Sequence, residues 1–483
     1  MRKIVLLALI TFMCSLLPSQ SALAIDLSTT KVFASTKIET MQRPDKVSIY
    51  LEVFRPNFDY WLTFNFSDSS PKKVLQGKPI EFLQNGNVIQ VRMKTADYLL
   101  ESELTQSVLT LSDANNRTVL EVFPAPTDIP TIKIEGNAAE ISNLNLLLTP
   151  AVAYGQYTMA FEGRFLKYFE KFSNFVLAFR ELTEGEKLSF ASGSAKFAYL
   201  EKIELNRPFY TPGIWKLLDE DFEIVGRIGS FKSYGQVVYP EGHGMTASPS
   251  GNPVVMSYIK RTVDSSWLKA PFNGPILDCV FSELKNGREL RKFSVWDWMN
   301  SNRDKSRKYL DAPGERAIDT TTDGNPVDFC HANSMTYSDK LDSYIVSLRS
   351  LDLVMIIDKN LKNINGLLYA EKARQHFARV LNANQITTFN NYTSQPKSKF
   401  ATWSQVKGKW VISEYVLPIS LPVCGNAELL PDRKLWVAGG CNNFDGNTAG
   451  VLYTLRTGKA LEIGRIRLNN SSGSYRVDLF DKF

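Results

Sequence analysis

The sequence predicts an all-β protein, a six-bladed β-propeller preceded by a small N-terminal β-sandwich domain. Three observations lead to this fold class. Short runs that alternate apolar and polar residues fill residues 26–123, prolines cluster in residues 124–130, and a polar turn with a short apolar strand then recurs along the chain. At 483 residues the chain is too long for one ordinary core, so two domains or one large repeat array are expected.

The chain opens with a predicted secretory signal peptide, residues 1–24. Two basic residues precede an apolar run from Ile4 to Leu17, and the triplet Ala22–Ala24 has the small residues of a cleavage site. The apolar run is too short to span a bilayer comfortably, and no second long run follows. We therefore expect a secreted, periplasmic protein without a membrane anchor.

The charge pattern argues against one class of partner. The formal net charge is +6, and removing the two basic residues of the signal peptide leaves +4. Lysines and arginines are scattered along the chain and form no runs, so we expect no nucleic-acid partner. The sequence leaves the oligomeric state open, and a homodimer is one of the alternatives.

Residues 25–130 are predicted to form the β-sandwich domain. Runs such as 47–53, 88–93 and 119–123 alternate apolar and polar residues, as half-buried strands do. Five or more short strands in about a hundred residues are typical of a small sandwich. The prolines that follow have little core character around them, so the domain boundary is placed there.

Residues 131–483 are predicted to form the propeller. A polar turn followed by a short apolar strand recurs at intervals of 42 to 91 residues, at Gly251–Val255, Asp342–Val346, Asn384–Thr388 and Asp432–Trp436. A four-stranded blade takes roughly 40–50 residues, so each interval holds one blade or two, and about 340 residues hold six. A generic all-β array without closure is the alternative.

One segment departs from this pattern. Within residues 159–182, apolar residues fall on one stripe at helical spacing, at Phe161, Phe165, Phe169, Phe172, Val176 and Phe179. This spacing predicts an amphipathic helix before or within the first blade. Such a stripe is usually core, and no function is assigned to it.

The cysteines indicate disulfides. Four of the five cysteines remain after cleavage, and an even number in an oxidising compartment favours bridges. Cys424 and Cys441 are the preferred pair, because both flank one predicted hairpin. Cys279 and Cys330 are then either a second bridge or two free buried thiols, and both alternatives stay open.

Histidine is scarce, with three in the whole chain. His243, His331 and His376 each lie eight to eleven residues before one of the recurring turns. If the blades are equivalent, the three imidazoles point toward one central region. Structural hydrogen bonding by each ring is one alternative, and an open zinc site made of three imidazoles is another. We expect no metal, because Asn333 and Arg349 beside them suit an oxyanion better than a cation.

The segments around these histidines resemble the bacterial arylsulfate sulfotransferases. Residues 328–335 (D-F-C-H-A-N-S-M) with 347–349 (S-L-R) look like the family's D-W-x-H-x-N-S-I and S-x-R signature. Residues 375–379 (Q-H-F-A-R) are similar to the family's Q-H-x-A-R stretch, and residues 242–252 to its first histidine and P-x-G-N turn. Residues 293–298 resemble a tryptophan-containing strand before the second histidine. The resemblance covers roughly residues 200 to 450.

The sequence also departs from the family pattern. Phe329 stands where the family has tryptophan, Cys330 lies directly before the second histidine, and Glu241 lies near the first one. The family's small disulfide loop is not clearly reproduced. These differences bear on substrate fit more than on the reaction.

The resemblance implies an aryl sulfotransferase that is independent of the nucleotide donor PAPS and uses no cofactor. A sulfuryl group would pass from a phenolic sulfate ester to a phenolic acceptor by a ping-pong reaction, through a sulfohistidine at His376. The resemblance implies that His243, His331, Asn333 and Arg349 hold the sulfuryl oxygens, with one histidine protonating the departing phenolate.

These residue types suit that chemistry. A transferring sulfuryl group spreads negative charge over three oxygens, so catalysis depends mainly on positioning and preorganised donors. Arg349 supplies a permanent charge and a donor fork. The sequence has no G-x-x-x-x-G-K loop for a nucleotide and no C-x-P-x-R motif of a hydrolytic sulfatase. The functional alternative is a non-catalytic secreted propeller that binds a ligand or a partner protein.

Overall fold

The computed structural model describes the following parts of the chain: residues 32–35, 46–52, 61–66, 81–85, 88–94, 107–112, 118–124, 130–141, 144–152, 155–162, 165–172, 175–182, 186, 194–203, 211–220, 222–269, 271–272, 274–311, 326–392, 397–421, 425–438, 448–469 and 474–480. The predicted signal peptide, residues 1–24, and the predicted Cys424–Cys441 bridge lie outside the described residues.

The chain divides into two compact units, Met1–Ile129 with Arg164–Tyr168, and Pro130–Gly163 with Phe169–Phe483. Strands β1 to β7 pair into one seven-stranded sheet, in the order β3-β6-β7-β1-β2-β5-β4. The strands are β1 (Val32–Ser35), β2 (Lys46–Glu52), β3 (Trp61–Phe66), β4 (Glu81–Asn85), β5 (Val88–Lys94), β6 (Ser107–Ser112) and β7 (Thr118–Pro124). Three predicted strands are confirmed as β2, β5 and β7, while the sandwich itself stays a prediction.

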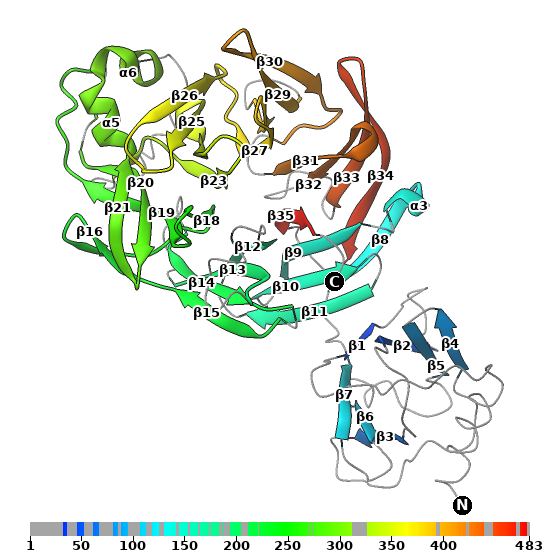
Figure 1. Cartoon of the computed structure of the whole chain (residues 1–483). Coiled ribbons are helices and arrows are strands. Elements are labelled where there is room, and N and C mark those ends of the chain that lie inside the picture. Colours follow the sequence, from blue (N-terminus) through cyan, green and yellow to red (C-terminus); the bar gives the residue numbers. More distant parts are fainter. Residues whose placement is uncertain are drawn as a thin grey trace, which may run out of the picture. The chain divides into compact units, whose positions relative to one another are not determined.

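The second unit is strand-rich, and its sheets are arranged like the blades of a propeller (Figure 1). Three sheets follow the chain in runs of four antiparallel strands, β12-β13-β14-β15, β18-β19-β20-β21 and β23-β24-β25-β26. Their bounds are β12 (Val176–Glu181), β13 (Phe197–Lys202), β14 (Gly213–Leu218), β15 (Ile224–Ile228), β18 (Met245–Ala247), β19 (Pro253–Arg261), β20 (Ile276–Lys285), β21 (Arg288–Ser294), β23 (Ala332–Ser338), β24 (Ser343–Leu348), β25 (Leu353–Asp358) and β26 (Ile364–Tyr369). A two-stranded sheet, β16 (Phe231–Ser233) with β17 (Gln236–Val238), lies between the first two in sequence.

The last part of the chain forms a nine-stranded sheet in the order β27-β28-β29-β30-β34-β33-β32-β31, with β8 added on β34. Its strands are β27 (His376–Asn382), β28 (Gln385–Asn390), β29 (Lys399–Val406), β30 (Lys409–Val416), β31 (Asn426–Leu430), β32 (Lys434–Ala438), β33 (Thr448–Arg456), β34 (Lys459–Asn469) and β8 (Thr131–Gly136). The two halves of this sheet meet at one parallel pair, Val416 with Lys459.

The C-terminal strand completes the sheet that begins the second unit. β35 (Ser474–Leu479) pairs antiparallel with β9 (Asn145–Val152), in the order β11-β10-β9-β35 with β10 (Gly155–Glu162) and β11 (Phe165–Phe172). The Asn145 amide donates to the Phe480 carbonyl at 3.3 Å. The start and the end of this unit are therefore joined by hydrogen bonds.

The predicted helix over residues 159–182 is wrong, because this segment forms strands β10, β11 and β12. A spacing of four residues places side chains on one face of a strand as well as of a helix, so most of the stripe fits both periods. Phe161 and Phe179 are buried core residues on different strands.

The strand expected at residues 293–298 is also only partly correct. Ser294 ends β21 and then caps helix α5 (Val295–Ser301), with its hydroxyl accepting from the Asp297 amide at 2.9 Å. Serine at this position satisfies a backbone N–H that the helix cannot. Helix α6 (Arg303–Leu310) follows, and α3 (Ala138–Ile141) is the third α-helix in the part of the chain that the structure describes.

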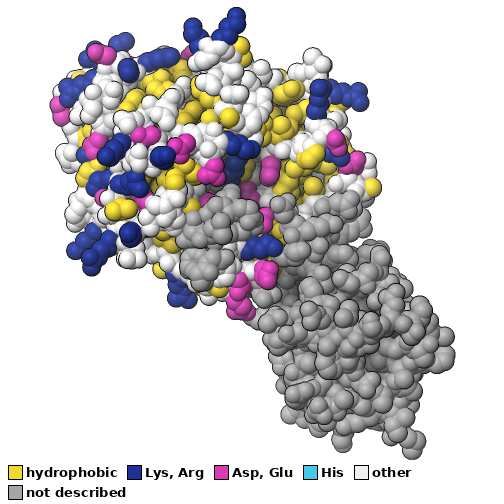
Figure 2. Space-filling view, viewed as in Figure 1, with side chains coloured by type: hydrophobic (Ala, Val, Ile, Leu, Met, Phe, Trp, Pro, Cys, Tyr) yellow, Lys and Arg dark blue, Asp and Glu magenta, His cyan; other side chains and the backbone are white. Residues whose placement is uncertain are grey.

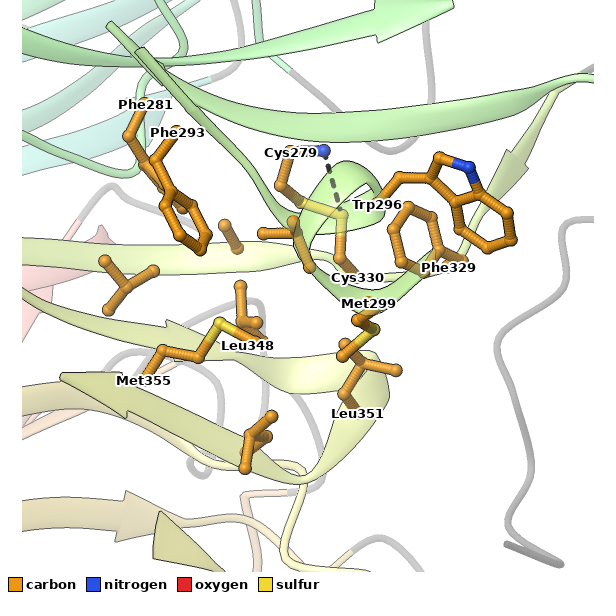
Figure 3. Close-up of a cluster of buried hydrophobic side chains, with 14 of the residues drawn as sticks. Cys279, Phe281, Phe293, Trp296, Met299, Phe329, Cys330, Leu348, Leu351 and Met355 are labelled. Atoms are coloured by element: carbon orange, nitrogen blue, oxygen red, sulfur yellow. Dashed lines mark hydrogen bonds between the residues drawn. A yellow bond between two sulfur atoms is a disulfide. The ribbon is translucent and has the colours of Figure 1, made fainter. Parts of the chain in front are cut away.

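The core lies between neighbouring sheets. On β24, Tyr344 and Val346 join the cluster shared with the preceding sheet, while Ile345 packs in the cluster shared with the following one. Side chains alternate across a strand, so each sheet supplies apolar residues to both of its faces. Figure 3 shows part of the first cluster, in which Phe281 and Met355 come from adjacent sheets. Side chains of both charge signs are spread over the face seen in Figure 2.

Candidate active site

Each of the three histidines lies at the start of the first strand of a sheet. His243 is two residues before β18, His331 directly precedes β23, and His376 is the first residue of β27. The recurring turns that follow them lead into the second strands β19, β24 and β28. The histidines therefore occupy matching positions in successive runs of strands.

Side-chain hydrogen bonds join these first strands to one another. Between β23 and β18, the Tyr337 amide donates to Thr246 Oγ1 at 3.0 Å. Between β27 and β23, the Ala378 amide donates to Ser334 Oγ at 3.0 Å. The strands that begin at or just after the histidines are thus neighbours in the second unit.

The rings of His243 and His331 lie together, with centroids 5.8 Å apart and planes inclined at 62°. Gly244 allows this approach, since a Cβ there would lie 2.9 Å from the backbone nitrogen of Met335. The third histidine is linked to the same strand: Asn333 Nδ2 donates to the carbonyl of Gln375, the residue before His376, at 2.8 Å.

His331 is held by a carboxylate three residues earlier. Asp328 Oδ1 accepts from the His331 backbone amide at 3.0 Å, and Asp328 Oδ2 lies 2.5 Å from His331 Nδ1. An ionised carboxylate only accepts hydrogen bonds, so Nδ1 of His331 carries a proton in this contact. The His331 backbone has φ +44°, a left-handed conformation that residues other than glycine rarely adopt. The two hydrogen bonds to Asp328 hold the backbone in this conformation.

A disulfide adjoins this histidine. Cys330 is bonded to Cys279 of β20, across a sequence separation of 51 residues (Figure 3). The short strand β22 (Val327–Asp328) also pairs in parallel with β20. The turn from Asp328 to His331 is therefore joined to the preceding sheet by a strand pair and by a disulfide, and the free-thiol alternative is wrong.

His243 has an equivalent carboxylate partner. Glu241 Oε1 lies 2.6 Å from His243 Nδ1, and its Oε2 accepts from the His243 backbone amide at 2.6 Å. The Thr211 hydroxyl also donates to Glu241 Oε1, at 2.7 Å. Burial alone would raise the pKa of Glu241, but the charge of His243 and these hydrogen bonds lower it below its usual value.

Two neutral groups lie at Nδ1 of His376. Asn391 Oδ1 lies 2.5 Å from His376 Nδ1, and the Arg374 carbonyl lies 3.2 Å from the same nitrogen. His376 is 3% exposed and Asn391 is 1% exposed. Both partner atoms are oxygens of neutral groups, which distinguishes this histidine from the other two.

Two arginines lie close to the site. Arg349 begins the short 3₁₀ helix η3 (Arg349–Leu351), and its backbone amide donates to the His331 carbonyl at 2.9 Å. Arg374 is 5% exposed, and its Nη1 donates to the Ser350 carbonyl at 3.2 Å. Burial raises the pKa of Asp352, although hydrogen bonds and the charges of both arginines oppose that shift.

Sequence reasoning did not assign the residues that orient the imidazoles. Asp328 and Glu241 lie two or three positions before their histidines, and this short spacing is a local signal that identifies them. Asn391 has no local signal, because it follows a hairpin 15 residues after His376. Buried Arg374 directly precedes the family-like segment 375–379, but burial cannot be read from the sequence.

No group of three or more histidine, cysteine or acidic side chains is placed to hold a metal ion among the described residues. No helix in that part of the chain is both long and apolar enough to cross a membrane.

The sheets define an all-β, propeller-like protein with a histidine at each of three matching strand starts, and the rings of two of these histidines are in contact. The family model Arylsulfotransferase (ASST) matches residues 222–373. This match confirms the predicted resemblance to the arylsulfotransferase family over residues 222–373 and supports a sulfotransferase enzyme. The matched residues include His243, His331, Asn333 and Arg349, and they end three residues before His376.

Other comparisons add no functional argument. No curated protein matches the chain. Among solved structures, hydrazine synthase from Kuenenia stuttgartiensis is 9% identical with a TM-score of 0.31, over 57% of this chain and 61% of that chain. A putative 6-phosphogluconolactonase from Bacteroides uniformis is 12% identical with a TM-score of 0.35, over 70% and 99%. A streptogramin B lyase is 9% identical with a TM-score of 0.35, over 70% and 98%.

Proposed function

We propose that the protein is a PAPS-independent aryl sulfotransferase that moves a sulfuryl group from a phenolic sulfate ester to a phenolic acceptor through a sulfohistidine. One observation carries the proposal. Three imidazoles from separate parts of the chain lie at matching strand starts, each with Nδ1 against an acceptor. That arrangement presents the Nε2 atoms for chemistry, in a chain that matches the arylsulfotransferase family over 222–373.

His376 is the proposed nucleophile. A nucleophilic imidazole must be neutral, and its neutral partners Asn391 and the Arg374 carbonyl do not stabilise a positive ring as a carboxylate would. In the first half-reaction Nε2 attacks sulfur, the N–S bond forms, and the bond from sulfur to the phenolic oxygen breaks. The phenolate carries away the electron pair of that bond.

His243 and His331 are the proposed donors. Each is backed by a carboxylate, which stabilises the imidazolium that holds an oxyanion or gives a proton to the leaving phenolate. Asn333 and Arg349 complete the proposed set of groups around the sulfuryl oxygens. In the second half-reaction the acceptor oxygen attacks sulfur, the N–S bond breaks, and the acceptor proton returns to the imidazole that gave one up.

The proposal includes six blades. The nine-stranded sheet contains two runs of four strands, and the apolar cluster between them includes Phe389 and Phe400 of one run and Leu435 and Val437 of the other. This face-to-face packing resembles the contact between the other sheets. With β9, β10, β11 and β35 as a further blade, residues 131–483 form six, and residues 25–130 form the N-terminal domain.

The proposed compartment is the periplasm. The Cys279–Cys330 disulfide suits an oxidising environment, since such bonds are rare in reducing compartments. The proposed partners are a phenolic sulfate donor and a phenolic acceptor. Profiling the enzyme against panels of aryl sulfates and phenols would identify both.

Release of p-nitrophenol from p-nitrophenyl sulfate tests the proposal. The protein should release p-nitrophenol at a sustained rate only when a phenol is supplied, and mass spectrometry after donor treatment alone should find one sulfated residue, His376. His376→Ala should lower the rate by a factor on the order of 10³ or more. Asn382→Ala, at the exposed far end of the same strand, is the matched control.

Two results would contradict the proposal. Equal turnover without an acceptor would indicate hydrolysis. No release and no sulfated histidine across a panel of aryl sulfates would favour the non-catalytic propeller.

A further inference from the structure

We propose that Asn391 is a positioning residue that fixes the tautomer of His376 and so keeps its Nε2 nucleophilic. The inference rests on the proposed role of His376. Asn391 Oδ1 lies 2.5 Å from His376 Nδ1, and both residues are buried. The tautomer depends on which end of the Asn391 amide faces the ring.

The orientation of the Asn391 amide is set by its other end. Asn391 Nδ2 donates to the carbonyl of Leu421 at 2.5 Å. A backbone carbonyl only accepts, so the nitrogen end of the amide must face Leu421 and the oxygen end must face His376. The reversed amide would place two acceptors against each other.

A second acceptor lies at the same ring nitrogen. The Arg374 carbonyl is 3.2 Å from His376 Nδ1. Two oxygens that only accept are compatible with a proton on Nδ1 and not with a lone pair there. The neutral ring therefore carries its lone pair on Nε2, the atom proposed to attack sulfur.

Asn391 is itself anchored. Ser398 is fully buried, its hydroxyl oxygen accepts from the Leu421 amide at 2.8 Å, and it lies 3.3 Å from the Asn391 carbonyl and 3.2 Å from the Leu421 carbonyl. The loop ends that carry Asn391 and Leu421 are thereby tied together. The acceptor for His376 is in place before any substrate binds, which is what preorganisation requires.

The three-histidine composition makes the tautomer measurable. In the NMR spectrum of protein labelled with ¹⁵N in histidine, three sets of imidazole signals should appear. The set that is missing from His376→Ala identifies His376. In the wild-type protein, above the pH at which this ring protonates, its pattern should be that of the Nδ1–H tautomer. Asn391→Ala should populate the Nε2–H tautomer and slow single-turnover sulfation of His376 by about fivefold to tenfold, the effect of one hydrogen bond.

Two further variants make the test specific. Asn390→Ala removes a neighbouring buried amide that bonds Thr388 and Glu414, so it should leave the tautomer unchanged. Ser398→Ala removes only the anchor, and it should shift the tautomer in the same direction as Asn391→Ala but less.

Two findings would overturn the inference: an Nε2–H tautomer at His376 in the wild-type protein, or an unchanged tautomer in both Asn391→Ala and Ser398→Ala. The spectra need no substrate. An Nδ1–H tautomer that both variants perturb, found together with no sulfation at His376, would therefore reject the proposed function while leaving the role of Asn391 intact.

Discussion

At the scale of single residues, the candidate site contains a buried carboxylate, Glu241, that is held by hydrogen bonds. Glu241 is 1% exposed and accepts hydrogen bonds from His243 and Thr211. An unpaired carboxylate at this depth would be strongly destabilising, whereas here hydrogen bonds and a neighbouring ring compensate its burial. The folded protein therefore favours the ionised form of Glu241, and acidification should reveal this.

The pH dependence of stability follows from that carboxylate. The pKa of Glu241 is lowered from its ordinary value of 4.5, so the unfolded chain binds more protons than the folded one near this pH. Glu241 therefore contributes stability that is present above about pH 4.5 and lost as the pH falls through the folded pKa. In Glu241→Gln the urea midpoint should fall less steeply than in the wild-type protein between about pH 5 and pH 3.

A control separates this carboxylate from the general acid response. Glu371 is exposed, and Glu371→Gln should follow the wild-type slope. If the midpoint of Glu241→Gln declined in parallel with the wild-type protein, the ionised form of Glu241 would not be stabilising the fold.

At the scale of strands and helices, alternation and turn residues were sufficient to find many of the strands. The four recurring turns all lead into the second strand of a run, at β19, β24, β28 and β32. The prediction failed along β10 to β12, where the spacing of the apolar residues fits both a helix and a strand. It also failed at α5, where Ser294 ends a strand and caps a helix. In both places tertiary packing decides between structures that the local pattern permits equally.

The disulfide is the element-scale feature whose removal is most informative. A bond that closes a loop of 51 residues should stabilise the fold by about 4 kcal/mol in the chain-entropy estimate. The double variant Cys279→Ala with Cys330→Ala should lose about 2 to 5 kcal/mol in free energy of unfolding. It should also lower kcat for sulfuryl transfer, because the turn that holds His331 is released from β20.

The readouts are urea unfolding and steady-state transfer between phenols. Retention of full kcat in a folded double variant would show that Asp328 and the Arg349 amide hold His331 without the bond.

At the scale of the whole second unit, the candidate site depends on contacts that span the sequence. The three histidines, and the carboxylates beside His243 and His331, carry local signals. Asn391 and buried Arg374 acquire their places only when distant strands pair. The same holds for β35, which the sequence does not mark. Ser474 of β35 and Phe480 directly after it bond to residues 325 and 335 positions earlier. Such pairings follow from closure of the sheets and not from local preference.

Truncation before Ser474 tests the importance of that closure. The deletion removes buried Val477 and Phe480 and the carbonyl that accepts from Asn426 and Trp436. The expected loss is about 3 to 6 kcal/mol from the two apolar side chains alone. Urea unfolding of the truncated chain measures it, and an unchanged midpoint would mean that the sheets hold together without β35.

The pairing of β35 with β9 also bears on the order in which the protein folds. Until residues 474–479 arrive, β9 presents an unpaired row of backbone donors and acceptors to any other chain nearby. Contacts across more than 300 positions form late, since a long stretch of chain must first be ordered. We therefore expect chains in which β9 is still unpaired to be prone to aggregation at high protein concentration.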